Sequence, residues 1–395
     1  MSAWPLVRLS DVATLSSGGT PSKANAAFWD GDIPWVSPKD MKTSCVADAE
    51  DKITREAIAG NAAKIVGVNS VLAVVRSGIL AHTFPVATLA RDVSFNQDIK
   101  AITPKNGSLL PAYLFWMLKG QEDRILRIGV KKGATVHSLS NGFLEALAFP
   151  LPPLEEQRRI AGLLDRAAEI RRRADTARAK TRAIIPALFL DMFGDPATNP
   201  KRWPQLPFGQ ITNEFRYGTN QKCHDEAGEG SVPVLRIPNV IGGQIDWSDI
   251  KHAALPAKEH EKTRLRVGDL LFVRTNGNPD YIGRCAHFDG QTDASYASYL
   301  IRARLADAMS PIFAIHHFNH PRFRPLMLRM GKTTAGNYNL SVEGLSALPV
   351  IVPPLAVQTA FAEQAQRLEA TARALDGAAA KAEAVAAALS GEVFG

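Results

Sequence analysis

The chain has 395 residues, a formal net charge of +7 and a sequence pI near 9.3. This length exceeds the size at which one hydrophobic core stops growing, so at least two domains are expected. Hydrophobic residues make up 46% and charged residues 22%, a balance that argues against disorder. The apolar runs, such as residues 184–190, are far too short to cross a bilayer.

The cysteines and the N-terminus indicate a cytoplasmic protein. Cys45, Cys223 and Cys285 are scattered and form neither a C-x-x-C pair nor a disulfide framework, which fits a reduced compartment. The first residues, MSAWPLVRLSDV, lack the charged-then-apolar layout of a secretory signal. The positive net charge is compatible with a polyanionic partner but does not identify one.

One plan is repeated along the chain. Pro152-Pro153-Leu154 opens a proline-poor stretch that closes with Phe193-Gly194, and Pro353-Pro354-Leu355 opens another that closes with Phe394-Gly395. These landmarks are 201 residues apart. Towards the front of each copy, Gly19-Thr20 aligns with Gly218-Thr219 at an offset of 199. The repeat predicts two similar structures that have diverged to bind different targets.

Each copy begins with a turn-rich part that mixes strands and helices. Apolar runs of β-forming residues at 70–75 and 269–273 predict equivalent strands, and runs at 113–118 and 312–318 predict equivalent buried helices. We therefore predict an α+β fold with two globular domains, at residues 1–152 and 195–352. Two long helices, at residues 153–194 and 353–395, follow them.

The long helices carry a heptad pattern of apolar residues. Phe361, Leu368, Leu375, Ala382 and Leu389 recur every seven residues, which predicts a helix that needs a partner to bury one face. We expect the two helices to pair antiparallel as a coiled coil, and the alternative is that each lies on its own domain. The predicted pairing positions are Ile160, Leu163, Ala167, Ile170, Ala174, Ile184, Leu188, Phe361, Leu368, Leu375, Ala382, Val385 and Leu389.

Four short patterns could carry catalysis or metal binding. Asn278-Pro279-Asp280-Tyr281 is similar to the Asn-Pro-Pro-Tyr motif of adenine methyltransferases but departs at its third position. Asp32 with Asp40-Met41-Lys42 loosely fits a metal-dependent nuclease. His316 and His320 have a zinc-like spacing without a third ligand, and Gly19-Thr20 lacks the Gly-Lys-Ser/Thr of a P-loop. We interpret all four as structural and predict no catalytic or metal-binding residue.

Recognition chemistry remains, because loops at equivalent places in both copies mix cations with short polar side chains. Lys and Arg anchor phosphates, while Arg, Asn, Gln, Lys and Ser/Thr also read base edges in the major groove. The alternative for any single residue is a solvated polar loop. The predicted DNA-binding residues are Thr20, Ser22, Lys23, Ser37, Lys39, Arg76, Lys131, Lys132, Thr219, Gln221, Lys222, Arg236, Asn239, Arg274, Asn276, Asn278, Lys332, Asn337 and Tyr338.

Over essentially its whole length the chain resembles the specificity subunit of type I restriction-modification systems. The resemblance rests on the segments 17–23 (SGGTPSK), 31–41 (GDIPWVSPKDM) and 152–160 (PPLEEQRRI). In the second copy it rests on Asn276-Gly277-Asn278, Ile282-Gly283-Arg284 and Leu348-Pro349 before Pro353-Pro354-Leu355. The second copy departs at residues 356–359 (AVQT), where the family usually repeats Glu-Glu-Gln-Arg/Lys.

The resemblance implies that each globular domain reads one half of a bipartite, asymmetric site in double-stranded DNA, and that the paired helices set the spacer. It implies a non-catalytic chain in a bacterial defence complex with two methyltransferase subunits and two restriction/translocase subunits. S-adenosylmethionine, ATP and Mg are expected in those partners. The alternatives are the recognition subunit of a type IIB-like restriction enzyme and, in a different class, a self-sufficient DNA methyltransferase or nuclease.

Overall fold

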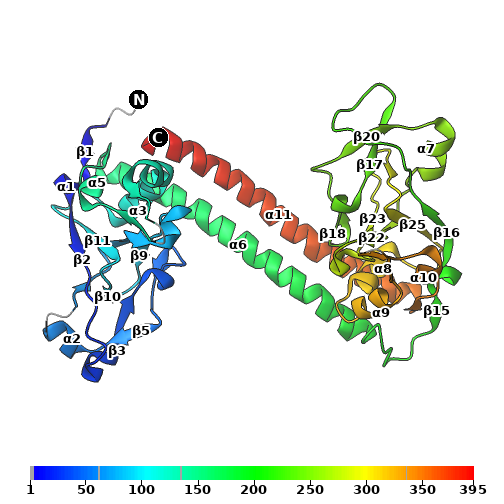
Figure 1. Cartoon of the computed structure of the whole chain (residues 1–395), viewed down its shortest axis with the longest axis horizontal. Helices are drawn as coiled ribbons and strands as arrows, with labels where there is room; N and C mark the ends of the chain where they lie inside the picture. The colour runs from blue at the N-terminus through cyan, green and yellow to red at the C-terminus, as the bar shows by residue number, and fades with distance from the viewer. Residues whose placement is uncertain (1–3, 61–62, 134–135, 335) are drawn as a thin grey trace. The chain divides into compact units, whose positions relative to one another are not determined.

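The structure is a computed structural model that describes residues 4–60, 63–133, 136–334 and 336–395. The predicted domain at 1–152 also contains residues 1–3, 61–62 and 134–135, and the one at 195–352 contains residue 335; these lie outside the described residues. The chain forms two compact units (Figure 1). Unit 1 comprises Met1–Asp175 with Leu375–Gly395, and unit 2 comprises Thr176–Ala374. The division therefore falls within both long helices, and the predicted domain limits stay a prediction.

Unit 1 is built from two larger sheets and two smaller ones. The five-stranded sheet has the order β2-β11-β7-β9-β4, the four-stranded sheet β5-β3-β10-β6, the three-stranded sheet β12-β13-β8, and β1 pairs with β14. The bounds are β1 Leu6–Arg8, β2 Ala13–Ser17, β3 Trp29–Val36, β4 Cys45–Val46, β5 Asp51–Ile53, β6 Ile65–Val66, β7 Val71–Val74, β8 Arg76–Ser77, β9 Val86–Leu89, β10 Val93–Phe95, β11 Ile99–Pro104, β12 Val130–Lys131, β13 His137–Leu139 and β14 Ala148–Pro150.

Five short helices complete the globular part of unit 1. They are α1 Leu9–Val12, α2 Arg55–Ala59, α3 Pro111–Gly120, α4 Glu122–Arg124 and α5 Asn141–Glu145. α3 begins with Pro111 at its first position, where the missing N–H costs no hydrogen bond. Tyr113, Leu114 and Met117 of α3 are fully buried in the main core of the unit, which confirms the helix predicted at 113–118.

Unit 2 repeats this construction. Its sheets have the orders β16-β25-β21-β23, β20-β17-β24 and β22-β27-β26, and two further pairs are β15-β28 and β18-β19. The bounds are β15 Gln205–Pro207, β16 Thr212–Tyr217, β17 Ser231–Leu235, β18 Val240–Ile241, β19 Gln244–Ile245, β20 Lys251–Ala254, β21 Leu270–Val273, β22 Thr275–Asn276, β23 Cys285–His287, β24 Ser295–Tyr296, β25 Leu300–Leu305, β26 Lys332–Thr334, β27 Asn337–Asn339 and β28 Pro349–Ile351.

The short helices of unit 2 follow the same order along the chain. They are α7 Ala257–Thr263, α8 Pro311–Asn319, α9 Arg324–Arg329 and α10 Val342–Ser346. α8 is the counterpart of α3 and begins, like α3, with a proline. The predicted strands at 70–75 and 269–273 are confirmed as β7 and β21, each buried along its whole length. The predicted α+β class and internal repeat are thus confirmed at the level of topology.

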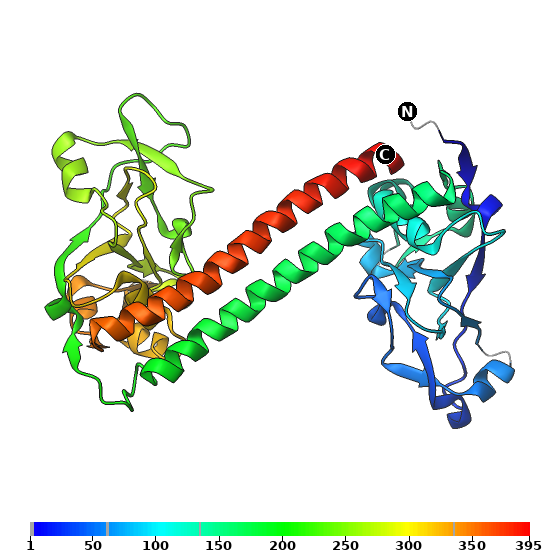
Figure 2. The same ribbon diagram turned by 180° about the vertical axis from the view of Figure 1, so that it is seen from behind.

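Two helices of 40 residues each, α6 (Leu154–Phe193) and α11 (Leu355–Phe394), are drawn in green and red in Figures 1 and 2. The core of unit 1 contains Ile160 and Leu164 from the start of α6 together with Phe394 from the end of α11. In unit 2 the core contains the end of α6 and the start of α11 instead. Within each unit the two helices therefore run antiparallel, as predicted.

The buried seam has a different phase from the predicted one. Several positions four residues after the heptad residues are buried, among them Leu164, Ile185 and Ala379, which are 1–5% exposed. Leu163, Ile184 and Val385, predicted as pairing residues three positions after, are 37%, 45% and 63% exposed. The prediction was wrong for these three, because alanines and β-branched residues at both spacings made the two phases look alike. Leu163 and Val385 line a shallow apolar groove of about 240 Å³ in unit 1.

A buried glutamine ties the start of each long helix to its globular part. The Gln157 side chain accepts from the Leu110 N–H at 2.9 Å and donates to the carbonyls of Ser108 and Pro152 at 2.8 and 2.9 Å. Gln358 in unit 2 makes the equivalent three bonds, at 2.9, 3.1 and 2.8 Å. Both glutamines are fully buried, so each long helix leaves its domain from a polar anchor that satisfies the loop backbone.

The front ends of the two units align one residue away from the predicted alignment. The Gly19 N–H donates to the Phe95 carbonyl, and the Thr219 N–H donates to the Tyr296 carbonyl. A Cβ on the preceding residue, Gly18 or Gly218, would collide with these carbonyls. Gly18 is therefore the counterpart of Gly218, and the pairing of Gly19 with Gly218 was wrong, because the close backbone approach selects the glycine.

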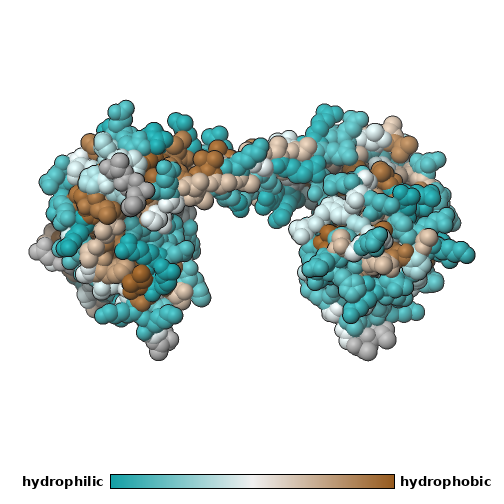
Figure 3. Space-filling view, turned by 90° about the horizontal axis from the view of Figure 1, so that it is seen from above, coloured by the Kyte–Doolittle hydropathy of each residue, from teal (hydrophilic) through white to brown (hydrophobic). Residues whose placement is uncertain are grey.

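None of the helices in the described part of the chain is long and apolar enough to span a membrane. The surface visible in Figure 3 is predominantly hydrophilic over both globular parts, with apolar residues scattered among polar ones.

Candidate nucleic-acid interface

The structure divides the predicted DNA-binding residues into those with bonds inside their unit and those that face solvent without such bonds. Ser37 and Arg236 belong to the first group and sit at equivalent turns. The carboxylate of Asp40 accepts from the backbone N–H and the hydroxyl of Ser37, at 2.9 and 2.8 Å. In unit 2 the Asn239 side chain accepts from the Arg236 N–H at 2.8 Å. These bonds make both turns structural.

Two further predicted residues at these turns, Lys39 and Asn239, have internal partners, and so does the Arg236 side chain. The Lys39 ammonium forms ion pairs with Glu50 at 3.2 Å and Asp51 at 3.0 Å, and the hydrogen bonds that it donates to Asp51 and Glu50 raise the pKa of Lys39. The Arg236 guanidinium contacts the Asp249 carboxylate at 3.0 Å. Asn239 is 1% exposed and donates to two backbone carbonyls. Asn239 is therefore part of the interior of unit 2.

The loop after β2 and its counterpart after β16 also use their polar side chains internally. The Thr20 hydroxyl donates to Gln97. Thr219 is 3% exposed and donates to the Glu259 carboxylate, which also accepts from the Gln221 amide at 3.4 Å. Ser22 is exposed, and its backbone carbonyl accepts from the Trp29 indole N–H at 3.1 Å.

Five predicted lysines remain available for an anion. Lys23, Lys131 and Lys132 in unit 1, and Lys222 and Lys332 in unit 2, are all exposed. None of the five has an ion-pair partner among the residues that the structure describes. Ammonium groups in this state can bind phosphate without first breaking an internal bond.

The three-stranded sheets bring several of the predicted residues together. In unit 1, Arg76 of β8 and Lys131 of β12 lie on either side of β13. In unit 2, Asn276 of β22 and Lys332 of β26 lie on either side of β27, which also holds Asn337 and Tyr338. The sequence did not reveal these sheets, since their strands are only two or three residues long.

Arg274 and Tyr338 support the unit 2 sheet from inside. The Arg274 guanidinium stacks over the Tyr217 ring at 4.5 Å and donates to the Ser298 carbonyl at 3.3 Å. Tyr338 is half-buried and packs against the main core of unit 2. The aromatic and aliphatic parts of both side chains thus stabilise the base of the sheet.

The Asn-Pro-Asp-Tyr segment forms a turn. Asn278 caps a short 3-10 helix, Pro279–Tyr281, by accepting from the Asp280 N–H at 2.9 Å. The Asn276 side chain in turn accepts from the Asn278 N–H at 2.8 Å. The Tyr281 ring is covered by the Arg284 guanidinium at 3.9 Å. The structural interpretation of this motif agrees with these contacts.

The histidines of α8 lie inside unit 2. His317 is fully buried among phenylalanines, and neither ring nitrogen has a hydrogen-bond partner among the described residues. Burial lowers the pKa of His317 to about 3 and that of His316 to about 4. Within the described part of the chain no group of three or more His, Cys, Asp or Glu side chains is placed to hold a metal ion.

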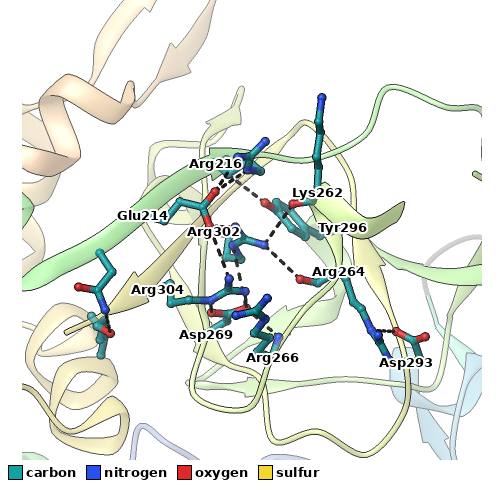
Figure 4. Close-up of polar contacts among 12 residues, drawn as sticks. Glu214, Arg216, Lys262, Arg264, Arg266, Asp269, Asp293, Tyr296, Arg302 and Arg304 are labelled. Atoms are coloured by element: carbon teal, nitrogen blue, oxygen red, sulfur yellow. Dashed lines mark hydrogen bonds and ion pairs between the residues drawn. The ribbon is translucent and has the colours of Figure 1, made fainter. Parts of the chain in front are cut away.

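A buried group of charges in unit 2, shown in Figure 4, was missed by the sequence analysis. Arg302 donates to the Glu214 carboxylate at 2.5 Å, and Arg304 binds Asp269 through two bonds of 2.8 Å. The side chains of Arg302 and Asp269 are 2% and 1% exposed. We refer to Glu214, Asp269, Arg302 and Arg304 as the ionic cluster.

Electrostatics in the ionic cluster favour the charged forms. Burial raises the pKa of Glu214, but the hydrogen bond from Arg216 and the charges of Arg302 and Arg304 outweigh it, so the pKa lies below its usual value. Two arginines against two carboxylates leave the cluster neutral, and Arg216 adds a cation at its edge, 2.7 Å from Glu214. The cluster therefore stabilises the interior of unit 2 and does not present a free charge.

Unit 1 has hydroxyl groups at the equivalent backbone positions. The strand registers match Thr14 with Glu214, Ser70 with Asp269 and Thr103 with Arg304. The hydroxyls of Ser70 and Thr103 lie 2.8 Å apart, and the Thr14 hydroxyl donates to the Thr103 carbonyl at 3.3 Å. We refer to Thr14, Ser70 and Thr103 as the hydroxyl cluster.

The sequence of this chain is similar to a family model and to known specificity subunits. A family model described as the type I restriction modification DNA specificity domain matches residues 1–173. The specificity subunit of the type I restriction enzyme EcoR124I/EcoR124II of Escherichia coli is 38% identical over 159 residues, which are 40% of this chain and 39% of that protein. The EcoKI specificity subunit of Escherichia coli strain K12 is 30% identical over 261 residues, 62% of this chain and 55% of that protein.

Solved structures agree with the fold over the whole chain. The S subunit of a type I restriction-modification system from M. genitalium matches with a TM-score of 0.66 at 14% identity, covering 100% of this chain and 96% of that one. A chain from a study of complex assembly and conformational transition of the type I R-M system matches with a TM-score of 0.51 at 17% identity, covering 99% and 97%. At these identities the matches show the fold alone.

Each of the two α+β units of this chain encloses one end of each long helix. In sequence the chain is similar to type I restriction-modification specificity subunits, and residues 1–173 match the model of the type I restriction modification DNA specificity domain. The matched segments span 39% and 55% of the two curated relatives.

Proposed function

We propose that this chain is the DNA sequence-specificity subunit of a type I restriction-modification complex. In this proposal each unit reads one half of a bipartite, asymmetric site in double-stranded DNA. The two long helices set the distance between the halves and dock the methyltransferase subunits. The chain itself carries no catalytic group, and catalysis belongs to the partner subunits.

One observation carries the proposal: the two units share their strand registers but differ in the polar residues that they expose. The three-stranded sheet is present in both units with the same order of strands. Arg76 in unit 1 stands where Thr275 stands in unit 2. Base edges are distinguished by their hydrogen-bond donors and acceptors. Two units that recognise different DNA sequences therefore need different polar side chains on a shared backbone.

The exposed lysines support binding to phosphate. Lys23, Lys131, Lys132, Lys222 and Lys332 are exposed in the two units, and the chain carries a net charge of +7. A protein that neutralises phosphates releases counterions, so its affinity falls steeply as salt rises. The proposal therefore includes strong salt dependence of binding by the complex.

Partners and cofactors are part of the same proposal. We assign S-adenosylmethionine to two methyltransferase subunits, and ATP with Mg to two restriction/translocase subunits. The three cysteines are free thiols, which is compatible with a complex that works in the reducing cytoplasm.

The test uses the chain reconstituted with type I methyltransferase subunits that assemble with it. The complex is incubated with a library of random duplexes and S-adenosylmethionine, and the modified duplexes are sequenced. We expect one bipartite motif with two different halves and a fixed gap. A single continuous motif, or modification without sequence preference, would contradict the proposal.

A second experiment separates the proposed function from a self-sufficient enzyme. The purified chain is incubated without partners, either with labelled S-adenosylmethionine and DNA or with Mg²⁺ and plasmid. We expect neither methyl transfer nor cleavage, and turnover by the chain alone would favour the enzyme. The type IIB-like alternative differs in where the reconstituted complex with all its partners cuts DNA: beside the bipartite site on both sides, instead of at a distance.

A further inference from the structure

The three-stranded sheet of unit 1 aligns three polar side chains in one row. Ser138 of β13 lies directly opposite Arg76 of β8 on one side and opposite Lys131 of β12 on the other. Residues directly opposite each other in antiparallel strands project to the same face of the sheet. Arg76, Ser138 and Lys131 therefore form one line of side chains, the unit 1 row.

The sheet of unit 2 holds an equivalent row. Asn339 of β27 lies opposite Thr275 of β22 and opposite Lys332 of β26. Thr275, Asn339 and Lys332 form the unit 2 row. In each row the central residue is followed in the chain by a buried leucine. Leu139, which follows Ser138, is 4% exposed, and Leu340, which follows Asn339, is 0% exposed.

Backbone bonds confirm that the two rows occupy the same place in their units. The Leu139 N–H donates to the Val75 carbonyl at 2.7 Å, and the Leu340 N–H donates to the Arg274 carbonyl at 2.8 Å. Val75 and Arg274 directly precede the first residue of each row. Lys131 thus corresponds to Lys332, Arg76 to Thr275 and Ser138 to Asn339.

The rows are open to solvent. The Arg76 side chain is 62% exposed, and its ion-pair partner among the described residues, Asp98, is 3.9 Å away. Ser138, Lys131 and Lys332 are exposed, and Thr275 and Asn339 are partly exposed. The unit 1 row can therefore exchange its weak internal contact for a ligand at little cost.

The size of a row matches a DNA groove. Neighbouring strands lie about 4.8 Å apart, so three strands place the outer side chains of a row about 10 Å apart. The major groove of B-DNA is about 12 Å wide and admits a two-stranded β-ribbon, so the side chains of a row, although not a broad sheet backbone, fit its width. A row laid across the groove places its central residue over the base edges and its two ends near the walls, where the lysine reaches a phosphate and the long Arg76 side chain of unit 1 can extend inward to a base edge.

The two rows have the same residue at one of their three positions and different residues at the other two. Both rows end in a lysine, which suits the phosphate present at every position of DNA. The other two places hold Arg and Ser in unit 1, and Thr and Asn in unit 2. Arginine pairs with the O6 and N7 of guanine, and asparagine pairs with the N6 and N7 of adenine.

We propose that the two rows are the base-reading elements of the chain. In this inference, which rests on the proposed function, Arg76 reads a guanine in the first half-site and Asn339 reads an adenine in the second. Lys131 and Lys332 bind the adjacent phosphates. Ser138 and Thr275 contribute hydroxyl contacts beside them.

The test for Arg76 uses the reconstituted methyltransferase complex and duplexes that vary one base pair at a time. The wild-type complex should prefer guanine at one position of the first half-site. R76A should lose about 10- to 100-fold of the preference at that position and leave the second half-site unchanged. R76Q should move the preference at that position towards adenine, because glutamine pairs with adenine.

The R76Q result also guards against a folding artefact, since a misfolded variant does not acquire a new preference. R55A is the matched control: Arg55 is exposed in the same unit, on α2 and outside the row. R55A should keep the wild-type base preference.

The lysine and the second row give independent readouts. K131A should weaken binding to all sequences alike and reduce the slope of log affinity against log salt by about 1. The control is K64A, at another exposed lysine of unit 1. K64A should leave the base preference unchanged and should reduce the salt slope by less than K131A does. N339A should abolish a preference for adenine in the second half-site only.

The inference and the proposed function fail in different ways. Suppose that the wild-type complex selects a bipartite site. If the R76A complex then keeps the wild-type base preference, or binds all sequences more weakly to the same extent, the rows do not read bases and the proposed function stands. If the wild-type complex selects no bipartite site, the proposed function itself is wrong.

Discussion

The two units place different chemistry at equivalent positions of the same strands. Unit 1 joins its strands β2, β7 and β11 with the hydroxyl cluster, in which every group is neutral. Unit 2 joins β16, β21 and β25 with the ionic cluster, in which two carboxylates meet two arginines. Because a buried polar group left without a partner is costly, either set is compatible with the same fold as long as its members are paired.

The fold therefore requires that polar side chains at these positions have bonding partners, but it does not require particular residues there. Arg302 stands where unit 1 has the buried Ala101, so the charged set also fills more volume. The polar residues inside the two units can therefore differ, as the polar residues on their surfaces do. We expect the two units to respond differently to mutation and to acid.

The largest difference is expected on removing one member of each cluster. Arg302→Ala leaves the carboxylates of Glu214 and Asp269 short of a buried counter-charge and should lower the free energy of unfolding by about 3 kcal/mol. Thr103→Ala in unit 1 removes one neutral contact and should cost about 1 kcal/mol. Urea denaturation of the full chain measures both, and equal costs would contradict the comparison.

The buried glutamines should show the opposite behaviour, since they are alike in the two units. Gln157→Leu and Gln358→Leu each leave one backbone N–H and two carbonyls without their side-chain partner, so each should cost about 2 kcal/mol. Denaturation of the two variants side by side checks this. A cost in one unit alone would show that the two long helices are anchored differently.

A smaller effect at neutral pH is expected at α8, where His317 stands in the place of Met117 of α3. His317→Met replaces a ring with two unpartnered nitrogens and should stabilise the chain by about 1 kcal/mol at pH 7.5. Met117 is equally buried in unit 1, so the substitution has a precedent in the same fold.

The same variant tests the acid response of unit 2. Burial lowers the pKa of His317 from 6.5 to about 3, so below pH 6.5 the unfolded chain takes up a proton that the folded chain does not. The stability that depends on neutral His317 is complete above pH 6.5 and is lost as the pH falls towards 3. The advantage of His317→Met should therefore grow by about 2 kcal/mol between pH 7.5 and pH 5, whereas an advantage independent of pH would contradict it.

The smallest effects are expected for single lysines on the surface. Lys23→Ala and Lys222→Ala should each weaken DNA binding by the reconstituted complex about threefold at every sequence, because each removes one phosphate contact. Lys39→Ala should change binding less, since Lys39 is held by Glu50 and Asp51. Binding titrations at two salt concentrations measure this, and a larger loss for Lys39→Ala would reverse the assignment.

Long periodic features could be predicted from the sequence. The repeat, α6 and α11, the helices α3 and α8, and the strands β7 and β21 follow from apolar patterns and proline landmarks, because these reflect burial that is continuous along the chain. Their local consistency explains why they were predicted correctly. The phase of the helix seam was not, because Leu163 and Leu164 are adjacent and equally apolar.

Features made by residues far apart in the chain could not be predicted. The ionic cluster joins Glu214 of β16, Asp269 just before β21 and Arg302 of β25, and no local pattern connects them. The three-stranded sheets escaped for a related reason: β8 has two residues and pairs with β13 some sixty residues later. Arg76 and Lys131 were predicted as DNA-binding residues because their loops mix cations with polar side chains, but Ser138, which lies between them in the row, was not predicted.

One measurement tests most directly whether each unit reads its own half-site. In a chimera, Trp4–Leu151 is replaced by a second copy of Trp203–Val352, so that both readers are those of unit 2, and the complex with the methyltransferase subunits is tested on random duplexes. The account predicts a site made of two copies of the second half-site, separated by the original gap. A site that still contains the first half-site, in a complex that assembles and methylates DNA, would contradict it.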